Sequence, residues 1–265
     1  MQFKNNIKCY CKNKFFKKIM SINKKPKLEI NYSIQKYKRN LFQCINCKHI
    51  INDHNFDLIN LYKGLYVKQN YQSMEGIKNN FERIISIPYS RSDNKNRVLR
   101  ILNFIKSKKI RNINLLDIGS GLGVFPYELK KKNIQVTCVE KDKYLIDHLK
   151  NFLFIKTVSD IKFLKKNYNF ITINKVLEHV PNVNSFLNLA LKKLKKKGYL
   201  YIEVPDYLAS KSSLINREEF FIEHYSVFSE FSLLETLSKF NLNIYLLERI
   251  REPSGKYTLL VFCQK

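Results

Sequence analysis

The alternation of apolar and polar residues predicts regular structure along the second half of the chain. Apolar residues recur every three or four positions in some segments, as on one face of a helix, and gather in short continuous runs in others, as in buried strands. The pattern predicts helices at 92–108, 124–132, 144–152, 185–196 and 229–240, and strands at 114–118, 135–139, 154–158, 170–174, 199–204, 242–247 and 257–262. Ser92 is the expected N-cap of the first helix.

The order of these elements predicts the fold class. Strands separated by single helices pair in parallel, with right-handed crossovers. The last two strands are joined only by the turn at 252–255, which indicates a hairpin and one reversed strand. We therefore expect an α/β protein with a Rossmann-like, seven-stranded, mostly parallel sheet that has one antiparallel strand. This domain should span residues 109–265, after a linker and helical lid at 61–108.

The stretch at 115–124 carries the clearest chemistry. A predicted buried strand ends at Asp117, and Gly119, Gly121 and Gly123 lead through a tight turn into the next helix. Glycine permits positive φ and leaves no Cβ between backbone and ligand, and the N–H groups of a helix N-terminus suit an anionic group. Glu140 ends the next strand, where a carboxylate can accept both hydroxyls of a ribose. The pattern predicts a site for a nucleoside cofactor.

Two details separate the candidate cofactors. Val124 stands where a dinucleotide fingerprint needs Gly or Ala for close helix–strand packing. The acidic Asp117 would repel a pyrophosphate but would attract the ammonium group of a methionine. Together, Val124 and Asp117 favour S-adenosylmethionine over a dinucleotide as the cofactor. An ordinary glycine-rich turn without a ligand is the alternative.

These motifs resemble, in the same order, those of the class I S-adenosylmethionine-dependent methyltransferases. The resemblance covers about residues 95–265 and implies that Glu140 binds the ribose, whereas Asp160 and Ile161 contact the adenine. It implies the full set of cofactor-binding residues Asp117, Gly119, Ser120, Gly121, Gly123, Glu140, Asp160, Ile161 and Asn174. Asn169 departs from the family, in which an Asp is common before the fourth strand.

The first 60 residues contain two cysteine pairs and no long helical or strand period. Four thiolates can bind Zn²⁺, so we expect a small zinc-binding segment at 1–60 with the ligands Cys9, Cys11, Cys44 and Cys47. The first pair is one residue shorter than the usual spacing, so unpaired reduced thiols are the alternative, and His54 is a substitute ligand. Cys138 and Cys263 lie in predicted strands and should be buried apolar residues.

A Cys₄ segment before this fold is similar to the subfamily that C-methylates nucleotide-linked sugars. The stretch at 221–228 matches its Glu-His-x-x-x-Phe motif. The resemblance implies that His224 is the catalytic base and that Glu223 orients or polarises the sugar. Packing or helix capping by His224 is the alternative. The subfamily has a further C-terminal domain, which we expect to be absent because the sequence stops at Lys265.

The function expected from this resemblance is C- or O-methylation of a sugar or nucleotide-sugar in surface polysaccharide biosynthesis. Two other polar groups lie outside that assignment. Glu178 and His179 follow the fourth strand, where we expect them to shape the loop beside the cofactor. Tyr66 and Tyr71 are candidates for a lid that faces the substrate.

The charge of the chain raises an alternative partner. A formal net charge of +26 suggests a polyanion, and an RNA methyltransferase is the alternative function. However, the excess comes from 39 Lys against 9 Arg, and Arg is the better fork for phosphate and base recognition. A nucleic-acid partner is therefore disfavoured, and a non-catalytic cofactor-binding scaffold is a third reading. The chain has no run of about 18 apolar residues and no secretory signal pattern, so we expect no membrane span and a cytoplasmic location.

Overall fold

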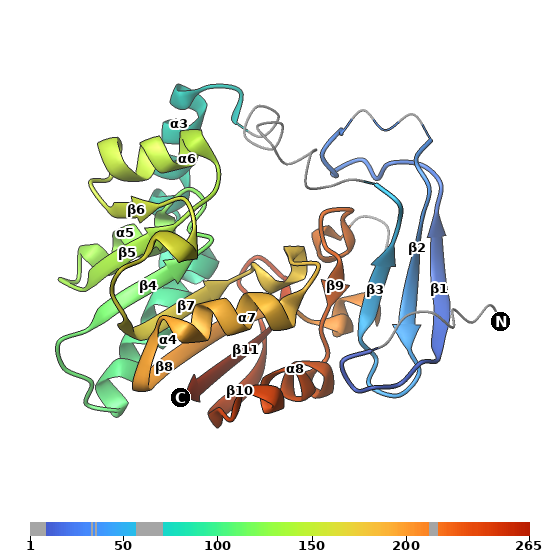
Figure 1. The fold of residues 1–265 in the computed structure, drawn as a ribbon. Coiled ribbons are helices and arrows are strands. Elements are labelled where there is room, and N and C mark those ends of the chain that lie inside the picture. The colour runs from blue at the N-terminus through green and yellow to red at the C-terminus, as the bar shows by residue number, and fades with distance from the viewer. Residues whose placement is uncertain (1–8, 33, 35, 57–70, 212–216) are drawn as a thin grey trace.

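Two sheets make up the framework of the protein (Figure 1). The computed structural model describes residues 9–32, 34, 36–56, 71–211 and 217–265, and all statements below refer to these. A seven-stranded sheet has helices on both faces, and a four-stranded sheet formed largely by the N-terminal segment packs beside it. Tyr66 lies outside the described residues.

The seven-stranded sheet confirms the predicted fold class. Its strand order is β10-β11-β8-β7-β4-β5-β6. The strands are β4 (Asn114–Ile118), β5 (Gln135–Val139), β6 (Lys156–Val158), β7 (Tyr168–Asn174), β8 (Leu194–Pro205), β10 (Asn243–Arg251) and β11 (Tyr257–Gln264). The pairs among β4 to β8 are parallel, and β11 runs antiparallel to both β8 and β10. The reversed strand is therefore the hairpin strand that the short 252–255 turn predicted.

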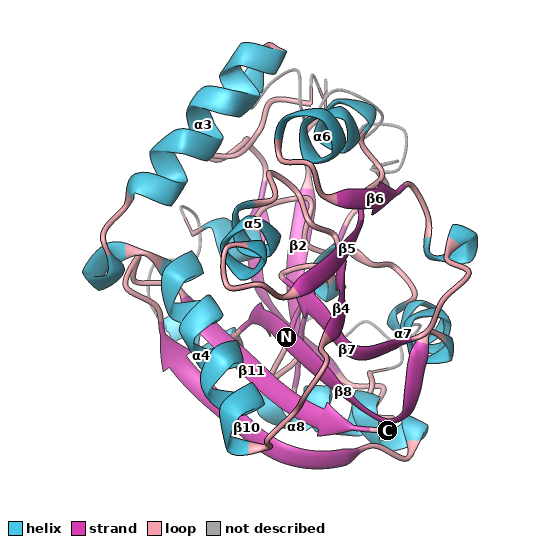
Figure 2. Cartoon of the chain, turned by 90° about the vertical axis from the view of Figure 1, so that its left-hand side faces the viewer, coloured by secondary structure: helices cyan, strands magenta, loops and turns pink. Residues whose placement is uncertain are grey.

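Alternate strand residues supply two cores, one on each face of this sheet. Leu115 and Phe170 pack with the first layer of helices, which contains α3 (Met74–Ser86), α4 (Asp93–Ser107) and α5 (Val124–Lys130). Their neighbours Leu116 and Ile171 pack with the second layer, α7 (Val183–Lys192) and α8 (Glu230–Leu237). Figure 2 shows α4 and α7 on opposite sides of the sheet. The period of two in the strands thus matches the helical stripes that cover them.

Several element ends differ from the sequence prediction. Ser92 is the N-cap of α4, as predicted, and accepts a hydrogen bond from the Lys95 N–H. The predicted helix at 144–152 divides into α6 (Lys143–Asp147) and a π-helical turn, His148–Phe152. The predicted helix at 185–196 ends at Lys192, and β8 begins at Leu194 rather than 199. Leu194 is buried and pairs with Tyr168, so tertiary packing overrides the helical propensity of the lysines that follow.

The four-stranded sheet joins distant parts of the chain. It is antiparallel, in the order β1 (Phe16–Ile22), β2 (Arg39–Cys44), β3 (Ile50–Asp53) and β9 (Ser226–Val227). The fourth strand therefore comes from the far end of the sequence, directly after Glu223 and His224. The segment boundaries at 60 and 108 stay a prediction. None of the described helices is both long enough and apolar enough to span a membrane.

Candidate functional site

The glycine turn between β4 and α5 leaves an open space at one position only. Gly121 has φ +51°, and a Cβ placed there would meet no atom of the described residues within 4 Å. Gly123 has φ +75°, but a Cβ there would lie 2.5 Å from Leu149 Cδ2 and 2.7 Å from Leu153 Cδ1. Gly123 therefore serves the packing of the turn, whereas Gly121 leaves room for a ligand against the backbone.

Asp117 lies at the carboxyl end of β4 and is almost fully buried. Its Oδ1 accepts hydrogen bonds from Thr172 Oγ1 at 2.7 Å and from Asn174 Nδ2 at 3.0 Å. Burial raises the pKa of Asp117 to about 6, although the Thr172 bond opposes that shift. Because the Asn174 amide faces Asp117, its Oδ1 is buried without a hydrogen-bond partner among the described residues. An unpaired hydrogen-bond acceptor, Asn174 Oδ1, therefore lies beside the Asp117 carboxylate.

Glu140 closes the other side of the turn. Its Oε2 accepts a hydrogen bond from the Gly121 N–H at 2.8 Å, and its Oε1 accepts one from the Lys141 N–H at 2.7 Å. Asp160 caps the short helix Ile161–Phe163 by accepting from the Lys162 N–H, and Ile161 is buried in the core. Since β4, β5 and β7 are parallel, the fold brings these groups to the same edge of the sheet.

These residues fit the cofactor that the sequence suggested. The space over Gly121, the unpaired Asn174 oxygen and two carboxylates at neighbouring strand ends suit a nucleoside that also carries an ammonium group. Asp117 and Asn174 would face the amino-acid part, and Glu140 the ribose.

A second polar cluster lies beyond β7, where two Glu-His pairs meet. The pairs are Glu178-His179, in the turn Leu177–His179, and Glu223-His224, just before β9. His179 Nδ1 lies 3.1 Å from the Glu223 carbonyl oxygen, and the Glu178 carbonyl accepts the Tyr225 N–H at 2.7 Å. The two imidazole rings meet edge to face, with centroids 4.6 Å apart. The structure thus places His179 and Glu178 beside the predicted catalytic pair.

Burial sets the charge state of this cluster. It lowers the pKa of His179 to about 4 and, with His179 beside it, the pKa of His224 well below the ordinary value. It raises the pKa of Glu178 to about 8 and of Glu223 to about 7. The imidazoles are therefore neutral at pH 7, and the carboxyl groups hold their protons to an unusually high pH. The recurrence of the Glu-His dipeptide was the sequence signal that could have linked the two pairs.

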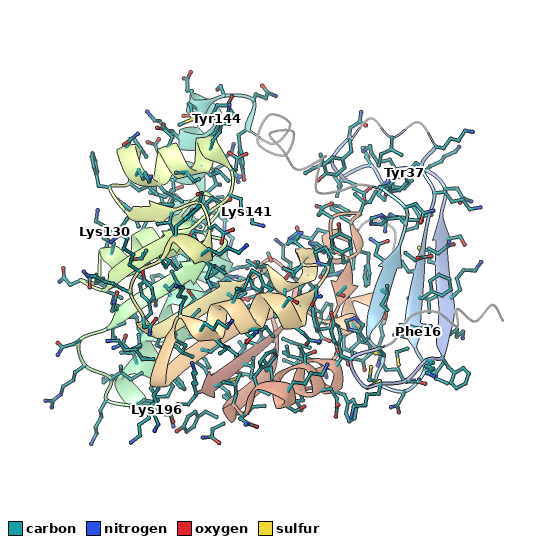
Figure 3. All side chains as sticks on the ribbon, in the orientation of Figure 1. Phe16, Tyr37, Lys130, Lys141, Tyr144 and Lys196 are labelled. Carbon is teal, nitrogen blue, oxygen red and sulfur yellow. The ribbon has the colours of Figure 1, made fainter. Side chains whose placement is uncertain are left out.

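The four N-terminal cysteines converge as the sequence predicted, at the end of the small sheet where Figure 3 shows sulfur atoms near Phe16. The Sγ atoms of Cys9 and Cys47 are 3.3 Å apart, and those of Cys11 and Cys44 are 3.7 Å apart. Zn–S bonds of about 2.3 Å in a tetrahedron place sulfur atoms about 3.8 Å apart. The Cys₄ set therefore fits a zinc ion.

Other cysteines and histidines take different places. The ring of His54 packs against Phe56 and Tyr225, and His54 does not belong to the Cys₄ set. Cys138 and Cys263 are fully buried in strands, as expected. Tyr71 packs with Ile77 at the start of α3.

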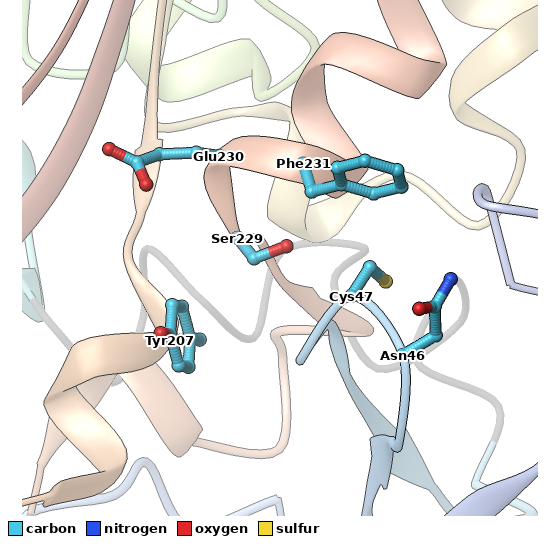
Figure 4. A pocket seen from close by; sticks show the side chains of 6 residues that line it. All are labelled: Asn46, Cys47, Tyr207, Ser229, Glu230 and Phe231. Carbon is cyan, nitrogen blue, oxygen red and sulfur yellow. The ribbon is translucent and has the colours of Figure 1, made fainter.

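A separate small pocket lies at the seam between the two sheets. Figure 4 shows its lining, which comes from the β2–β3 turn, the start of α8 and one further aromatic residue, namely Asn46, Cys47, Ser229, Glu230, Phe231 and Tyr207. None of these six belongs to the glycine turn or to the Glu-His pairs. The pocket therefore marks the contact of the Cys₄ segment with α8 rather than the cofactor site.

Comparison with known proteins assigns the family. A family model described as a methyltransferase domain matches residues 90–247, which is more than half of the chain. The chain belongs to this methyltransferase family. The seven-stranded sheet with its reversed strand is accordingly the S-adenosylmethionine-dependent methyltransferase fold.

Relatives of the methyltransferase domain act on varied molecules. The chain is 28% identical to a ubiquinone biosynthesis O-methyltransferase of Hydrogenovibrio crunogenus over 38% of this chain and 46% of that protein. It is 36% identical to ribosomal RNA small subunit methyltransferase A of Mycoplasmopsis synoviae over 30% of this chain and 28% of that protein. The chain thus spans about half the length of these curated relatives, or less.

A solved structure shares the fold of the methyltransferase domain. Magnesium protoporphyrin IX methyltransferase from Synechocystis PCC 6803, solved with bound SAH, superposes with a TM-score of 0.58 at 11% identity. The match covers 76% of this chain and 99% of that one. At this identity the likeness concerns the fold alone.

We predict different consequences for two alanine substitutions in the glycine turn. Both positions have positive φ, so each substitution should lower the free energy of unfolding by about 1–2 kcal/mol. Gly121→Ala should in addition weaken S-adenosylmethionine binding at least ~10-fold, because its methyl group enters the open space. Gly123→Ala should lose a further ~1–3 kcal/mol of stability through its clash with Leu149 and Leu153.

Urea denaturation and isothermal titration calorimetry measure the two effects, and Gly123→Ala is the matched control for Gly121→Ala. Equal cofactor affinity in wild type and Gly121→Ala would contradict the placement of the cofactor over the glycine turn.

Proposed function

We propose that this protein transfers a methyl group from S-adenosylmethionine to carbon or oxygen of a sugar or nucleotide-sugar, with His224 as the base. Surface polysaccharide biosynthesis is the setting that such a product serves. Bound at the glycine turn, the cofactor supplies a methyl group already activated by its positive sulfur. The protein has to align the acceptor, exclude water and remove a proton.

The observation that carries the proposal is the state of the His224 ring. Its Nδ1 lies 3.0 Å from the Glu219 carbonyl oxygen, which can only accept a hydrogen bond. Nδ1 must therefore carry the proton, and Nε2 keeps its lone pair. The ring is nearly buried and its pKa is depressed by burial, so it is a neutral proton acceptor at pH 7.

Glu223 supports an oxygen-rich acceptor. The residue is 8% exposed, and its Oε2 has no hydrogen-bond partner among the described residues. With a pKa raised to about 7, the carboxyl group can donate a hydrogen bond to a keto or hydroxyl oxygen of the acceptor. A buried base beside a buried acid suits a small polar substrate better than a folded nucleic acid.

The proposed activity is tested by incubating a nucleotide-sugar pool with the protein and labelled S-adenosylmethionine, followed by mass spectrometry. We expect one species to gain a single methyl group. His224→Gln should form this product at least ~100-fold more slowly while binding the cofactor normally. Wild-type rates in this variant would exclude the base assignment.

Two other outcomes would replace the proposed function. Methylation of RNA with a steep dependence on salt would favour the RNA alternative that the ribosomal RNA relative also represents. Cofactor binding without methyl transfer to any acceptor in a broad panel would favour the other alternative, a non-catalytic cofactor-binding scaffold.

The pH dependence of turnover tests the role of Glu223. If the protonated carboxyl group donates to the acceptor, activity is present below pH 7 and falls as the pH rises through the Glu223 pKa of about 7. His224 contributes no change in this range, because its pKa lies lower and the ring is already neutral. Glu223→Gln keeps an N–H donor and cannot ionise, so the decline near pH 7 should disappear.

Glu178→Gln is the matched control, since it makes the same change in the neighbouring Glu-His pair and should retain the decline near pH 7. Activity that rises through pH 7 in the wild type would show that Glu223 acts as an anion or not at all.

We also propose that Cys9, Cys11, Cys44 and Cys47 hold one structural Zn²⁺. The Sγ atoms of Cys9 and Cys47 are within hydrogen-bond distance, and this contact lowers the pKa of the Cys47 thiol from its ordinary value, which favours the thiolate that a metal needs. Lys12 and Lys48, which each follow a cysteine pair, have positive φ, and the two turns close through the hydrogen bonds Lys12 N–H to Cys9 carbonyl and Lys48 N–H to Cys44 carbonyl. The two cysteine pairs thus lie in similar tight turns.

Zinc content tests this site. Elemental analysis of the purified protein should give one zinc ion per chain, and Cys44→Ser should lose it and melt at lower temperature. Cys263→Ser is the control, because it changes a buried cysteine outside the cluster and should retain the ion. Equal zinc content in both variants would reject the Cys₄ ligand set.

A further inference from the structure

The N-terminal sheet holds the backbone that carries the proposed base. Two side chains of its strands, Arg39 and Asn52, and one from the connection between β1 and β2, Glu29, bind the backbone of three consecutive residues just before Glu223. Arg39 NH1 donates to the Phe220 carbonyl at 2.6 Å, Asn52 Nδ2 donates to the Phe221 carbonyl at 3.0 Å, and the Ile222 N–H donates to Glu29 Oε2 at 2.7 Å.

We call Glu29, Arg39 and Asn52 the cradle of this backbone segment, and Arg39 lies at its centre. Its NH2 donates to Glu29 Oε2 at 2.9 Å, its NH1 also reaches Asn52 Oδ1 at 3.3 Å, and its Nε donates to Tyr37 Oη at 2.7 Å. The side chains of Arg39 and Glu29 are both 0% exposed. One planar guanidinium therefore fixes both other members of the cradle and a backbone carbonyl at once.

The cradle acts on the geometry of His224 through short links. The ring Nδ1 bonds to the Glu219 carbonyl, and the His224 N–H donates to the Phe221 carbonyl at 3.0 Å. Glu219 and Phe221 flank Phe220, whose carbonyl Arg39 binds. A shift of this backbone would therefore turn the imidazole.

The opposite side of the same segment is held by the methyltransferase domain. The Tyr225 N–H donates to the Glu178 carbonyl, while the Tyr225 carbonyl accepts the Asn52 N–H at 3.1 Å. β9 then continues as a partner of β3. The His224 segment is thus clamped between the η4 turn, Leu177–His179, and the N-terminal sheet.

We propose that Arg39 is a positioning residue for His224, and that the N-terminal sheet is for this reason a working part of the active site. The inference rests on the proposed function, in which His224 is the base. Among the described residues, the hydrogen bonds and the ion pair of Arg39 involve neither the glycine turn nor the predicted cofactor-binding residues. Its loss should impair proton removal and leave cofactor binding intact.

The test compares Arg39→Lys with Arg111→Lys, the same substitution at an exposed position. Lysine keeps the charge but cannot bridge Phe220, Glu29 and Tyr37 simultaneously. Long-range ¹H–¹⁵N spectra of the histidine rings report the tautomer of each imidazole, and the His224→Gln variant identifies the His224 signals. We expect the His224 signals to move from a pure Nδ1–H pattern toward a mixture in Arg39→Lys only.

Turnover and cofactor binding complete the comparison. Arg39→Lys should lower kcat by up to about 100-fold, since a small misplacement of a catalytic group has effects of that size, while the KM of the acceptor and the calorimetric affinity for S-adenosylmethionine change less than about threefold. His224 signals and kcat equal to those of the wild type would overturn the inference.

Asn52→Asp decides the question should Arg39→Lys fail to fold. This substitution keeps the shape of the side chain, replaces the donor to the Phe221 carbonyl with an acceptor and adds a negative charge beside Arg39, so it should produce the same spectral change. Because the spectra need no acceptor substrate, their result is independent of the proposed reaction. Moved His224 signals together with full activity of His224→Gln would uphold the positioning and refute the base.

Discussion

The pairing of β3 with β9, reinforced by the buried Arg39, is the contact on which the arrangement of the candidate active site depends. It brings a segment near the N-terminus against residues 219–228, and so gives the Glu223-His224 pair a fixed backbone. This segment belongs to the connection between β8 and α8, so the contacts with β3 and Arg39 add a second support to those with the η4 turn. A buried guanidinium is costly to desolvate, and here each of its described contacts is a good hydrogen bond.

Buried ion pairs of arginine occur elsewhere in the molecule as well. Five of the nine arginines pair with buried or nearly buried carboxylates: Arg39 with Glu29, Arg97 and Arg100 with Glu203, Arg217 with Glu219, and Arg249 with Asp206. Burial alone would raise the pKa of Glu203, but Arg97, Lys175 and Arg100 lower it to about 2. Lysines instead project from the surface, as Lys130 and Lys196 do in Figure 3. The high positive charge therefore comes mostly from solvated lysines on the surface, whereas most arginines form ion pairs with buried carboxylates.

Burial is the largest cause of the pKa shifts in the candidate site, as it is for the ion-paired Asp206. Asp117, Glu178 and Glu223 have raised pKa values, and both histidines of the Glu-His pairs have lowered ones. Each shift disfavours the charged form, because burial removes the water that would solvate the charge. Asp117 and Glu178 lie at or shortly after the carboxyl ends of the parallel strands β4 and β7, the edge at which this kind of sheet binds ligands.

The sequence by itself determined the seven-stranded sheet, the place of its reversed strand, the glycine turn at 119–123 and the family to which the domain belongs. These features follow from local signals: apolar periodicity, a Ser N-cap, positive-φ glycines and an acidic residue at a strand end. The sequence did not determine every helix and strand end: α7 stops at Lys192, because the burial of Leu194 in β8 outweighs the helical preference of the lysines after it.

Only the tertiary structure decided which distant groups meet. Nothing in the spacing of Glu29, Arg39 and Asn52 relates them to backbone atoms more than 160 residues away, since hydrogen bonds to a main chain leave no side-chain pattern at the receiving positions. The convergence of the two Glu-His pairs likewise depends on where the turn after β7 and the segment before β9 come to lie. Local sequence patterns thus determine the helices and strands of this protein, whereas long-range packing brings the residues of the candidate site together.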